Sequence, residues 1–190
     1  MTVGVVFETH ATSEDNERGI ATGWLDGRLS TLGRRQASEL GERRRDDGLA
    51  AVYVSDLGRA VETARLAFDG SGLQPIADAR LRECGYGDWN GMPRARLEAE
   101  RIARIDRPWP GGESWRAAVE RVDGFLEELT VARDGARVLV IGHVATRLAL
   151  DLRTGNGPLE ALVAAPFNWQ PGWEYRVDRQ VAQTRDRKEA

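Results

Sequence analysis

Length, composition and charge set the first limits on this protein. The chain has 190 residues, 41% of them hydrophobic, and its 27 basic and 30 acidic side chains give a formal net charge of −3. This length suits one folded unit, so we expect a single domain over residues 1–190. The slight negative charge gives no electrostatic reason to expect nucleic acid or a membrane surface as a partner.

The cysteine count and the apolar runs exclude further classes of protein. Cys84 is the only cysteine, which excludes an internal disulfide and a metal site built from several thiolates. The longest apolar runs, near Val138–Ile141 and Leu148–Leu150, are far too short to span a bilayer. No secretory pattern opens the sequence, so we expect a cytoplasmic protein.

The first half of the chain alternates between apolar strands and amphipathic helices. The pattern predicts a strand at Val3–Glu8, a helix capped by Ser30 or Thr31 and running to about Asp47, a strand at Ala51–Val54 and a helix at Leu57–Phe68. The apolar side chains that identify the two helices are Leu32, Ala37 and Leu40 in the first, and Val61, Ala64 and Leu66 in the second. The segment Ile76–Leu81 then leads into a turn-rich stretch through Gly91.

The second half continues the alternation. It predicts helices at Arg94–Ile105, Glu113–Ala132 and Ala145–Leu152, a strand at Arg137–Ile141, and closing strands at Trp173–Val177 and Val181–Thr184. Strands that alternate with helices along a chain are typical of a parallel sheet covered on both faces. We therefore expect a three-layer α/β/α sandwich with a mainly parallel sheet.

The placement of the two histidines is the first functional signal. His10 and His143 are the only histidines, and each directly follows an apolar strand. Ligands of open α/β sheets bind at the carboxyl ends of the strands, so the two imidazoles are expected to converge there. Two alternatives remain at this point: unrelated histidines at two strand ends, or a metal site. A metal site needs a third ligand, and no His-x-x-x-His or Glu-x-x-His pair supplies one.

Other nucleophiles are less well supported. Cys84 has Asn90 rather than an arginine six residues later, and no Gly-x-Ser-x-Gly elbow is present. Around the histidines, in contrast, a series of short motifs occurs in order. They are Thr9-His10-Ala11-Thr12-Ser13 with Asn16, Gly23-Trp24-Leu25-Asp26, Leu29–Gly33, Ser55-Asp56-Leu57 with Arg59, Leu81-Arg82-Glu83, Pro110–Ser114 and Val138–His143.

Taken together, this series resembles the histidine phosphatase superfamily, phosphoglycerate-mutase-like, branch 1. The resemblance implies a phosphoglycerate-mutase-like fold and a covalent phosphohistidine intermediate, with neither a metal nor another cofactor. It implies that His10 is the nucleophile, that Arg59 and His143 bind phosphate oxygens, and that Glu83 is the proton donor. Ser13 and Asn16 are expected to add neutral donors. The implied partner is a small phosphorylated substrate, and a homodimer is left open.

Two residues beside His10 depart from the family pattern. Thr9 stands where the family has arginine, and Glu8 stands where an apolar residue is usual. Loss of one charged donor to the transition state costs about 3 kcal/mol, or ~10²-fold in rate. We consider Arg28 and Arg147 as replacements for the missing arginine, and Thr9 and Glu8 as further residues at the phosphate site.

A phosphomonoesterase is the function that this inventory favours. The alternatives are a phosphoglycerate-mutase-type phosphotransferase, and a degenerate or re-tuned member that binds a phosphorylated ligand or catalyses another reaction. A mutase requires a covered site, and the short segment Asp88–Glu113 leaves little material for such a cover. Glu8 disfavours an acidic substrate. Five tryptophans are candidates to line a pocket for an apolar or aromatic leaving group: Trp24, Trp89, Trp109, Trp169 and Trp173.

Overall fold

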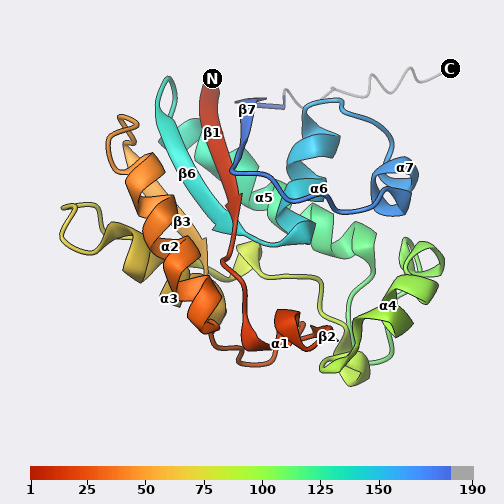
Figure 1. Ribbon diagram of the computed structural model, residues 1–190. Coiled ribbons are helices and arrows are strands. Elements are labelled where there is room, and N and C mark those ends of the chain that lie inside the picture. The colour runs from red at the N-terminus through yellow and green to blue at the C-terminus, as the bar shows by residue number, and fades with distance from the viewer. Residues whose placement is uncertain (181–190) are drawn as a thin grey trace, which may run out of the picture.

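A five-stranded sheet organises the molecule in the computed structural model, which describes residues 1–180 (Figure 1). The strand order is β4-β3-β6-β1-β7, with β7 antiparallel to β1 and the other neighbours parallel. The strands are β1 (Thr2–Thr9), β3 (Ala51–Ser55), β4 (Ile76–Asp78), β6 (Arg137–Gly142) and β7 (Trp173–Asp178). A small second sheet pairs β2 (Ile20–Ala21) with β5 (Met92–Pro93).

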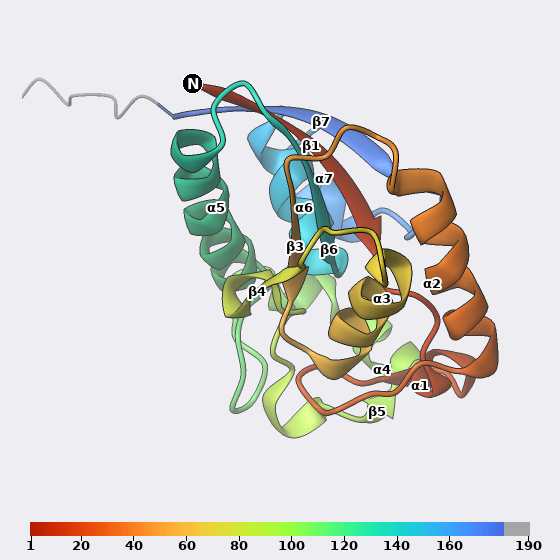
Figure 2. The same cartoon turned by 90° about the vertical axis from the view of Figure 1, so that its left-hand side faces the viewer.

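Helices cover both faces of the sheet, and Figure 2 shows the three layers side by side. One face carries α2 (Thr31–Arg44) and α3 (Gly58–Phe68). The other face carries α5 (Trp115–Ala132) and α6 (Val144–Arg153). Shorter helices lie in the connections: α1 (Glu14–Glu17), η1 (Ala79–Leu81), η2 (Gly87–Trp89), α4 (Arg94–Glu100), η3 (Ile102–Arg104) and α7 (Leu159–Ala164).

Alternation along β1 divides the core into two parts. Val5 and Phe7 pack in the cluster that includes α5 and α6 side chains, whereas Val6 packs with residues of α2 and α3. Successive side chains of a strand point to opposite faces, so Glu8 continues the face of Val6 and points toward α2. Glu8 pairs there with Arg43 and Arg44 of α2, whereas His10 lies beyond the end of the strand.

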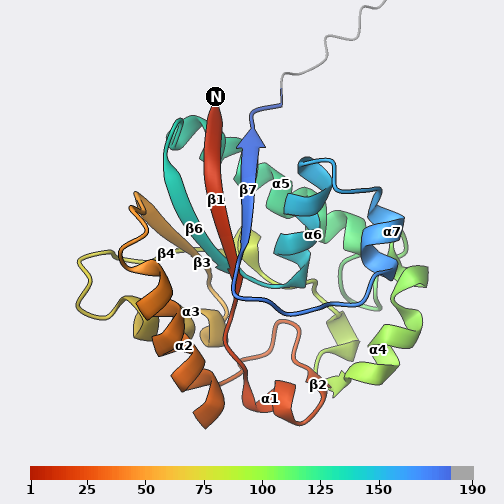
Figure 3. The ribbon, with the colours of Figure 1, turned by 45° about the horizontal axis from the view of Figure 1, so that its top comes forward.

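The carboxyl ends of β1, β3 and β6 meet at one edge of the sheet. Thr9 at the end of β1 is opposite Gly142 at the end of β6, and Ser55 closes β3 on the far side of β6. Figure 3 shows the N-terminus and the end of β7 at the opposite end of the sheet. Side chains that follow β1 and β6 therefore project into the same space.

The predicted sandwich with a mainly parallel sheet is confirmed, and some details differ. The predicted helix at Arg94–Ile105 is divided into α4 and η3, and α7 was not predicted. Leu32 and Val61, two of the apolar side chains by which the sequence identified α2 and α3, are 42% and 39% exposed rather than buried. The predicted strand Val181–Thr184 lies outside the described residues. Within residues 1–180, no helix combines the length and the apolar character that a membrane crossing needs.

Candidate active site

The sheet brings the two histidines together. His10 follows β1, His143 follows β6, and their ring centroids are 5.0 Å apart. The backbone N–H of His10 donates to the carbonyl of Gly142 at 3.1 Å, which continues the strand pairing as far as the first histidine. The two imidazoles therefore share one site because their strands are neighbours.

The His10 ring is oriented by a backbone carbonyl. Its Nδ1 is 2.7 Å from the carbonyl oxygen of Ala11, and because this oxygen only accepts, Nδ1 carries the ring proton. Arg59 Nε donates to His10 Nε2 at 3.3 Å, so Nε2 holds the lone pair. Burial, and next the charge of Arg59, lower the pKa of His10 to about 3. At neutral pH the ring is uncharged and has a nucleophilic nitrogen.

Arg59 lies in the first turn of α3 and is held by a loop. Its guanidinium donates to the carbonyls of Gly23 at 2.9 Å and Leu25 at 3.4 Å, and lies 3.5 Å from His143 Nδ1. Gly23 has φ of 57°, and a Cβ there would come 1.8 Å from Asn90 Oδ1, so only glycine fits. Burial lowers the pKa of Arg59, and the charge of Glu83 opposes that change.

His143 is buried against β3. Its Nε2 is 2.9 Å from the hydroxyl of Ser55, which can either donate or accept. Burial, followed by the charge of Arg59, lowers the pKa of His143 well below its usual value. The ring is therefore neutral, and Ser55 is compatible with either tautomer.

Glu83 faces the pocket from the segment after η1. Its carboxylate accepts backbone N–H groups of Cys84 at 2.9 Å, Ala145 at 3.1 Å and Val144 at 3.3 Å. The last two belong to the first turn of α6, where helix N–H groups have no partner inside the helix. The start of α6 thus fixes a carboxylate beside His143.

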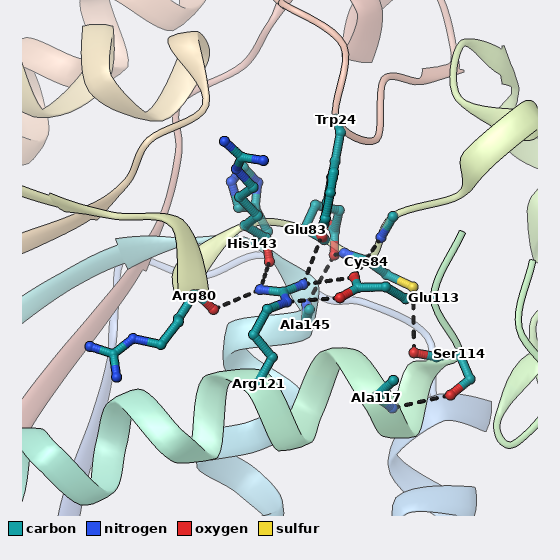
Figure 4. A network of polar contacts seen from close by, with 12 residues as sticks. Trp24, Arg80, Glu83, Cys84, Glu113, Ser114, Ala117, Arg121, His143 and Ala145 are labelled. Atoms are coloured by element: carbon teal, nitrogen blue, oxygen red, sulfur yellow. Dashed lines mark hydrogen bonds and ion pairs between the residues drawn. The ribbon is translucent and has the colours of Figure 1, made fainter. Parts of the chain in front are cut away.

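Arg121 on α5 supports the backbone around Glu83, as Figure 4 shows. Its guanidinium donates to the carbonyls of Arg80 at 2.7 Å, Arg82 at 3.2 Å and Glu83 at 3.2 Å. The same group makes two bonds of 2.8 Å to the Glu113 carboxylate, which also accepts from the backbone N–H of Gly85 at 2.9 Å. Sequence reasoning assigned no role to this arginine.

Trp24 connects the loop that holds Arg59 with the segment that carries Glu83. Its indole N–H donates to the carbonyl oxygen of Glu83 at 2.6 Å. The guanidinium of Arg82 lies 5.0 Å from the Trp24 ring centroid, and that of Arg121 lies 5.8 Å from it. The loop therefore positions two of the candidate catalytic residues at once.

These groups open on a pocket of about 580 Å³. Thr9, His10, Asn16, Arg59, Glu83 and His143, all predicted site residues, line it. Sequence reasoning missed Thr12, Gln36, Tyr86, Arg94, Arg101 and Trp115, which also line it. Two of these, Arg94 and Arg101, come from the segment Asp88–Glu113, as do Leu97, Glu98 and Trp109, so that segment forms a wall of the pocket despite its shortness. Trp109 and Trp169 line the pocket as expected, whereas Trp24, Trp89 and Trp173 do not.

Four predicted site residues lie outside the pocket. Glu8 is 1% exposed and pairs with Arg44 at 2.9 Å and Arg43 at 3.5 Å, because strand alternation directs it to α2. Ser13 caps α1 by accepting the backbone N–H of Asn16 at 3.1 Å. The assignments of Glu8 and Ser13 to the phosphate site are corrected accordingly.

Neither arginine considered as a replacement reaches the pocket. Arg28 is exposed at the surface and does not line the pocket. Arg147 pairs with Asp151 at 3.3 Å, and its guanidinium lies 4.6 Å from the ring centroid of Trp173. Thr9 is therefore not compensated by either of them. Separately, residues 1–180 contain no group of three or more His, Cys, Asp or Glu side chains placed to hold a metal ion.

Comparison with known proteins identifies the family. The sequence model of the histidine phosphatase superfamily (branch 1) matches residues 5–167. A 2,3-bisphosphoglycerate-dependent phosphoglycerate mutase of Allorhizobium ampelinum is 35% identical over 75% of each chain. Phosphoserine phosphatase 1 of Hydrogenobacter thermophilus is 31% identical over 78% of this chain and 74% of its own.

A solved structure agrees with these sequence matches. The mycobacterial glucosyl-3-phosphoglycerate phosphatase superposes with a TM-score of 0.74 at 27% identity, covering 86% of this chain and 84% of its own. The chain belongs to the histidine phosphatase superfamily, branch 1.

Proposed function

We propose that this protein is a phosphomonoesterase that hydrolyses a small phosphorylated metabolite through a phosphohistidine at His10. One observation carries the proposal: His10 is a neutral imidazole with Nδ1 anchored on Ala11 and Nε2 beside the Arg59 guanidinium. Two of the similar proteins named above are phosphatases, which supports hydrolysis, and one is a mutase.

The first step transfers the phosphoryl group to the protein. His10 Nε2 attacks phosphorus, the N–P bond forms, and the ester P–O bond breaks. Protonated Glu83 gives its proton to the leaving alcohol. Arg59 binds oxygens of the transferring group. When the Ser55 hydroxyl donates to His143 Nε2, the ring proton of His143 lies on Nδ1, and His143 donates this proton to a further phosphate oxygen. These donors stabilise the negative charge on the equatorial oxygens.

The second step restores the protein. Water attacks phosphorus, Glu83 takes a proton from that water, and the N–P bond breaks to release inorganic phosphate. Glu83 is then protonated for the next cycle. Because the side chains of the pocket supply the charge neutralisation, we expect turnover without an added metal ion.

Rapid mixing with an aryl phosphate tests the proposal. We expect an acid-labile, base-stable phosphoryl adduct on His10, absent in His10→Asn, and release of inorganic phosphate that persists in EDTA. Undiminished phosphatase activity in His10→Asn would overturn the assignment of the nucleophile. Loss of activity on chelation, restored by zinc or manganese, would favour a metallohydrolase instead.

The fate of the phosphoryl adduct, together with phosphate binding measured by calorimetry, distinguishes the alternatives. A mutase transfers the phosphoryl group of the adduct to an added alcohol or phosphoglycerate faster than to water. A degenerate member binds phosphate, as calorimetry detects, but releases no product from any phosphomonoester. Either outcome would displace the hydrolase.

A further inference from the structure

Glu8 and Arg44 form a buried ion pair that the proposed reaction does not use. Glu8 is 1% exposed, and its Oε1 accepts from Arg44 Nε at 2.9 Å. Arg43 adds a longer contact of 3.5 Å to the other carboxylate oxygen. Taking two charges out of water costs free energy that their attraction often does not repay, so a buried pair calls for an explanation beyond stability. The remaining contacts of Arg44 supply one.

The guanidinium of Arg44 also contacts residues 165–172, the connection between α7 and β7. Arg44 Nη2 donates to the carbonyl of Pro171 at 3.1 Å. A Cβ on Gly172 would come 2.1 Å from Arg44 Nη2 and 3.1 Å from Glu8 Oε1, so the backbone of Gly172 rests directly on the ion pair. Gly172 also has φ of 88°, which other residues rarely adopt. The backbone at this point is thus fitted to the pair.

The bond from Arg44 is what joins the α7–β7 connection to another element. Within residues 1–180, no other hydrogen bond links residues 166–172 to a residue outside that span. Gln170 bonds only to Gly172, through its carbonyl and its side chain. Figure 3 shows the connection crossing from α7 to the start of β7 beside the end of β1, where Trp173 is opposite Phe7. Arg44 therefore fixes the connection relative to the sheet.

The α7–β7 connection contributes two aromatic side chains to the pocket. Phe167 and Trp169 line it, as do Thr9 and His10 at the end of β1. Phe167 packs on Trp173, with ring centroids 6.0 Å apart, so β7 also supports its position. Trp169 is 59% exposed and lies two residues before Pro171. The place of Trp169 accordingly depends on where Arg44 holds Pro171.

Resting on the proposed function, we propose that Glu8 and Arg44 are positioning residues that hold the α7–β7 connection so that Trp169 forms one edge of the substrate pocket. Neither residue of the pair lines the pocket, so the pair acts through the connection. Its effect falls on the group attached to the phosphoryl oxygen. The pair thereby sets how strongly the pocket prefers a large leaving group to a small one.

Binding of non-hydrolysable phosphonates tests the pair without turnover. Calorimetry compares 1-naphthylphosphonate with methylphosphonate, and the ratio of their affinities measures the preference for a large group. The double variant Glu8→Leu/Arg44→Met removes both charges together, so that neither is left buried without its partner. We expect it to lower the preference roughly two- to tenfold, the worth of one aromatic contact, with the affinity for methylphosphonate unchanged. If the double variant does not fold, Gly172→Ala replaces it, because it disturbs the same contact from the side of the connection.

Arg153→Met is the matched control. The Arg153 side chain is 2% exposed, pairs with Asp123 at 2.7 Å, and donates to the carbonyl of Asp178 at 2.8 Å, at the other end of β7. Its loss should lower stability and keep the full preference. Trp169→Ala should lower the preference, and combining it with the double variant should give no further loss, because the pair acts through Trp169.

Four results would overturn the proposal. They are a wild type without preference, an unchanged preference in the double variant or its replacement, an equal loss of affinity for both phosphonates there, and additive effects of the double variant and Trp169→Ala. A similar fall of the preference in Arg153→Met would also count against it, since general destabilisation would then explain the effect. The proposed function fails separately, by absence of turnover in a protein that still discriminates between the two phosphonates.

Discussion

At the scale of single residues, the site is notable for a neutral side chain at Thr9. Thr9 lines the pocket directly before the candidate nucleophile, where relatives of this kind are expected to carry arginine. The structure also removes one complication, since Glu8 is paired with Arg44 on the far face of β1. An arginine introduced at position 9 would therefore not form an ion pair with Glu8.

We expect Thr9→Arg to raise kcat/KM on generic aryl phosphates, by up to ~10²-fold if the new guanidinium reaches the transition state. Steady-state kinetics of wild type and variant measure this directly. Thr9→Gln is the control, because it adds a long side chain without a charge and should give little gain. Equal activity of Thr9→Arg and Thr9→Gln would show that a cation at this position has no use in this site.

A second expectation concerns the pair Ser55 and His143. If the Ser55 hydroxyl donates to His143 Nε2, the ring proton lies on Nδ1 and is available to a phosphate oxygen. Ser55→Ala removes that donor, and we expect kcat to fall about tenfold with KM little changed, because the lost bond acts in the transition state. Thr154→Ala provides a control hydroxyl at the end of α6. A fall in stability with unchanged kcat would make Ser55 only a packing residue.

At the scale of elements, the site depends on connections as much as on strand ends. Trp24 joins the loop that holds Arg59 to the carbonyl of Glu83. Arg121, on α5, gathers three carbonyls of the segment that carries Glu83 and two oxygens of Glu113. The proton donor is consequently held from both sides by elements far away in the sequence.

We expect Arg121→Gln to lower kcat by about tenfold and the free energy of unfolding by about 2 kcal/mol. The reason is that it leaves Glu113 and three carbonyls without their donor. Arg121→Lys keeps the charge but not the planar fork, so it should recover stability more than activity. The readouts are denaturant unfolding and steady-state kinetics, which separate kcat from KM. An unaltered kcat in a destabilised Arg121→Gln would mean that Arg121 supports the fold alone.

The elements that sequence patterns predicted well are those set by local chemistry. Apolar runs predicted β1, β3 and β6 to within one or two residues, and Ser30, one of the two predicted caps, caps α2. The division of Arg94–Ile105 carried no glycine or proline as a signal. Arg28 and Arg147 were misplaced because a long side chain finds its partner through tertiary contacts, which spacing along the chain does not reveal. The direction of Glu8 could have been predicted, since β1 continues to Thr9 and alternation places it with Val6.

At the scale of the whole molecule, helices cover both faces of the sheet, and strands β1 and β6 lead into two neutral histidines. Burial, with the nearby Arg59 charge, lowers the pKa of both His10 and His143. In the unfolded chain each histidine titrates near 6.5. Between that pH and the lower folded pKa, the unfolded state binds protons that the folded state does not, so stability falls as the pH falls.

The histidine contribution to stability is therefore complete above about pH 6.5 and is lost toward the folded pKa, which for His10 is about 3. Each histidine can add at most about 1.4 kcal/mol per pH unit to the slope. We expect His10→Gln to flatten the dependence of unfolding free energy on pH between 6.5 and 4, measured by urea denaturation at several pH values. Carboxylates also titrate toward the lower end of this range, but they are common to both proteins and cancel in the difference. Parallel curves for wild type and His10→Gln would mean that His10 takes up its proton at the same pH in the folded and in the unfolded protein. A ring so readily protonated would be a poor nucleophile for the proposed reaction.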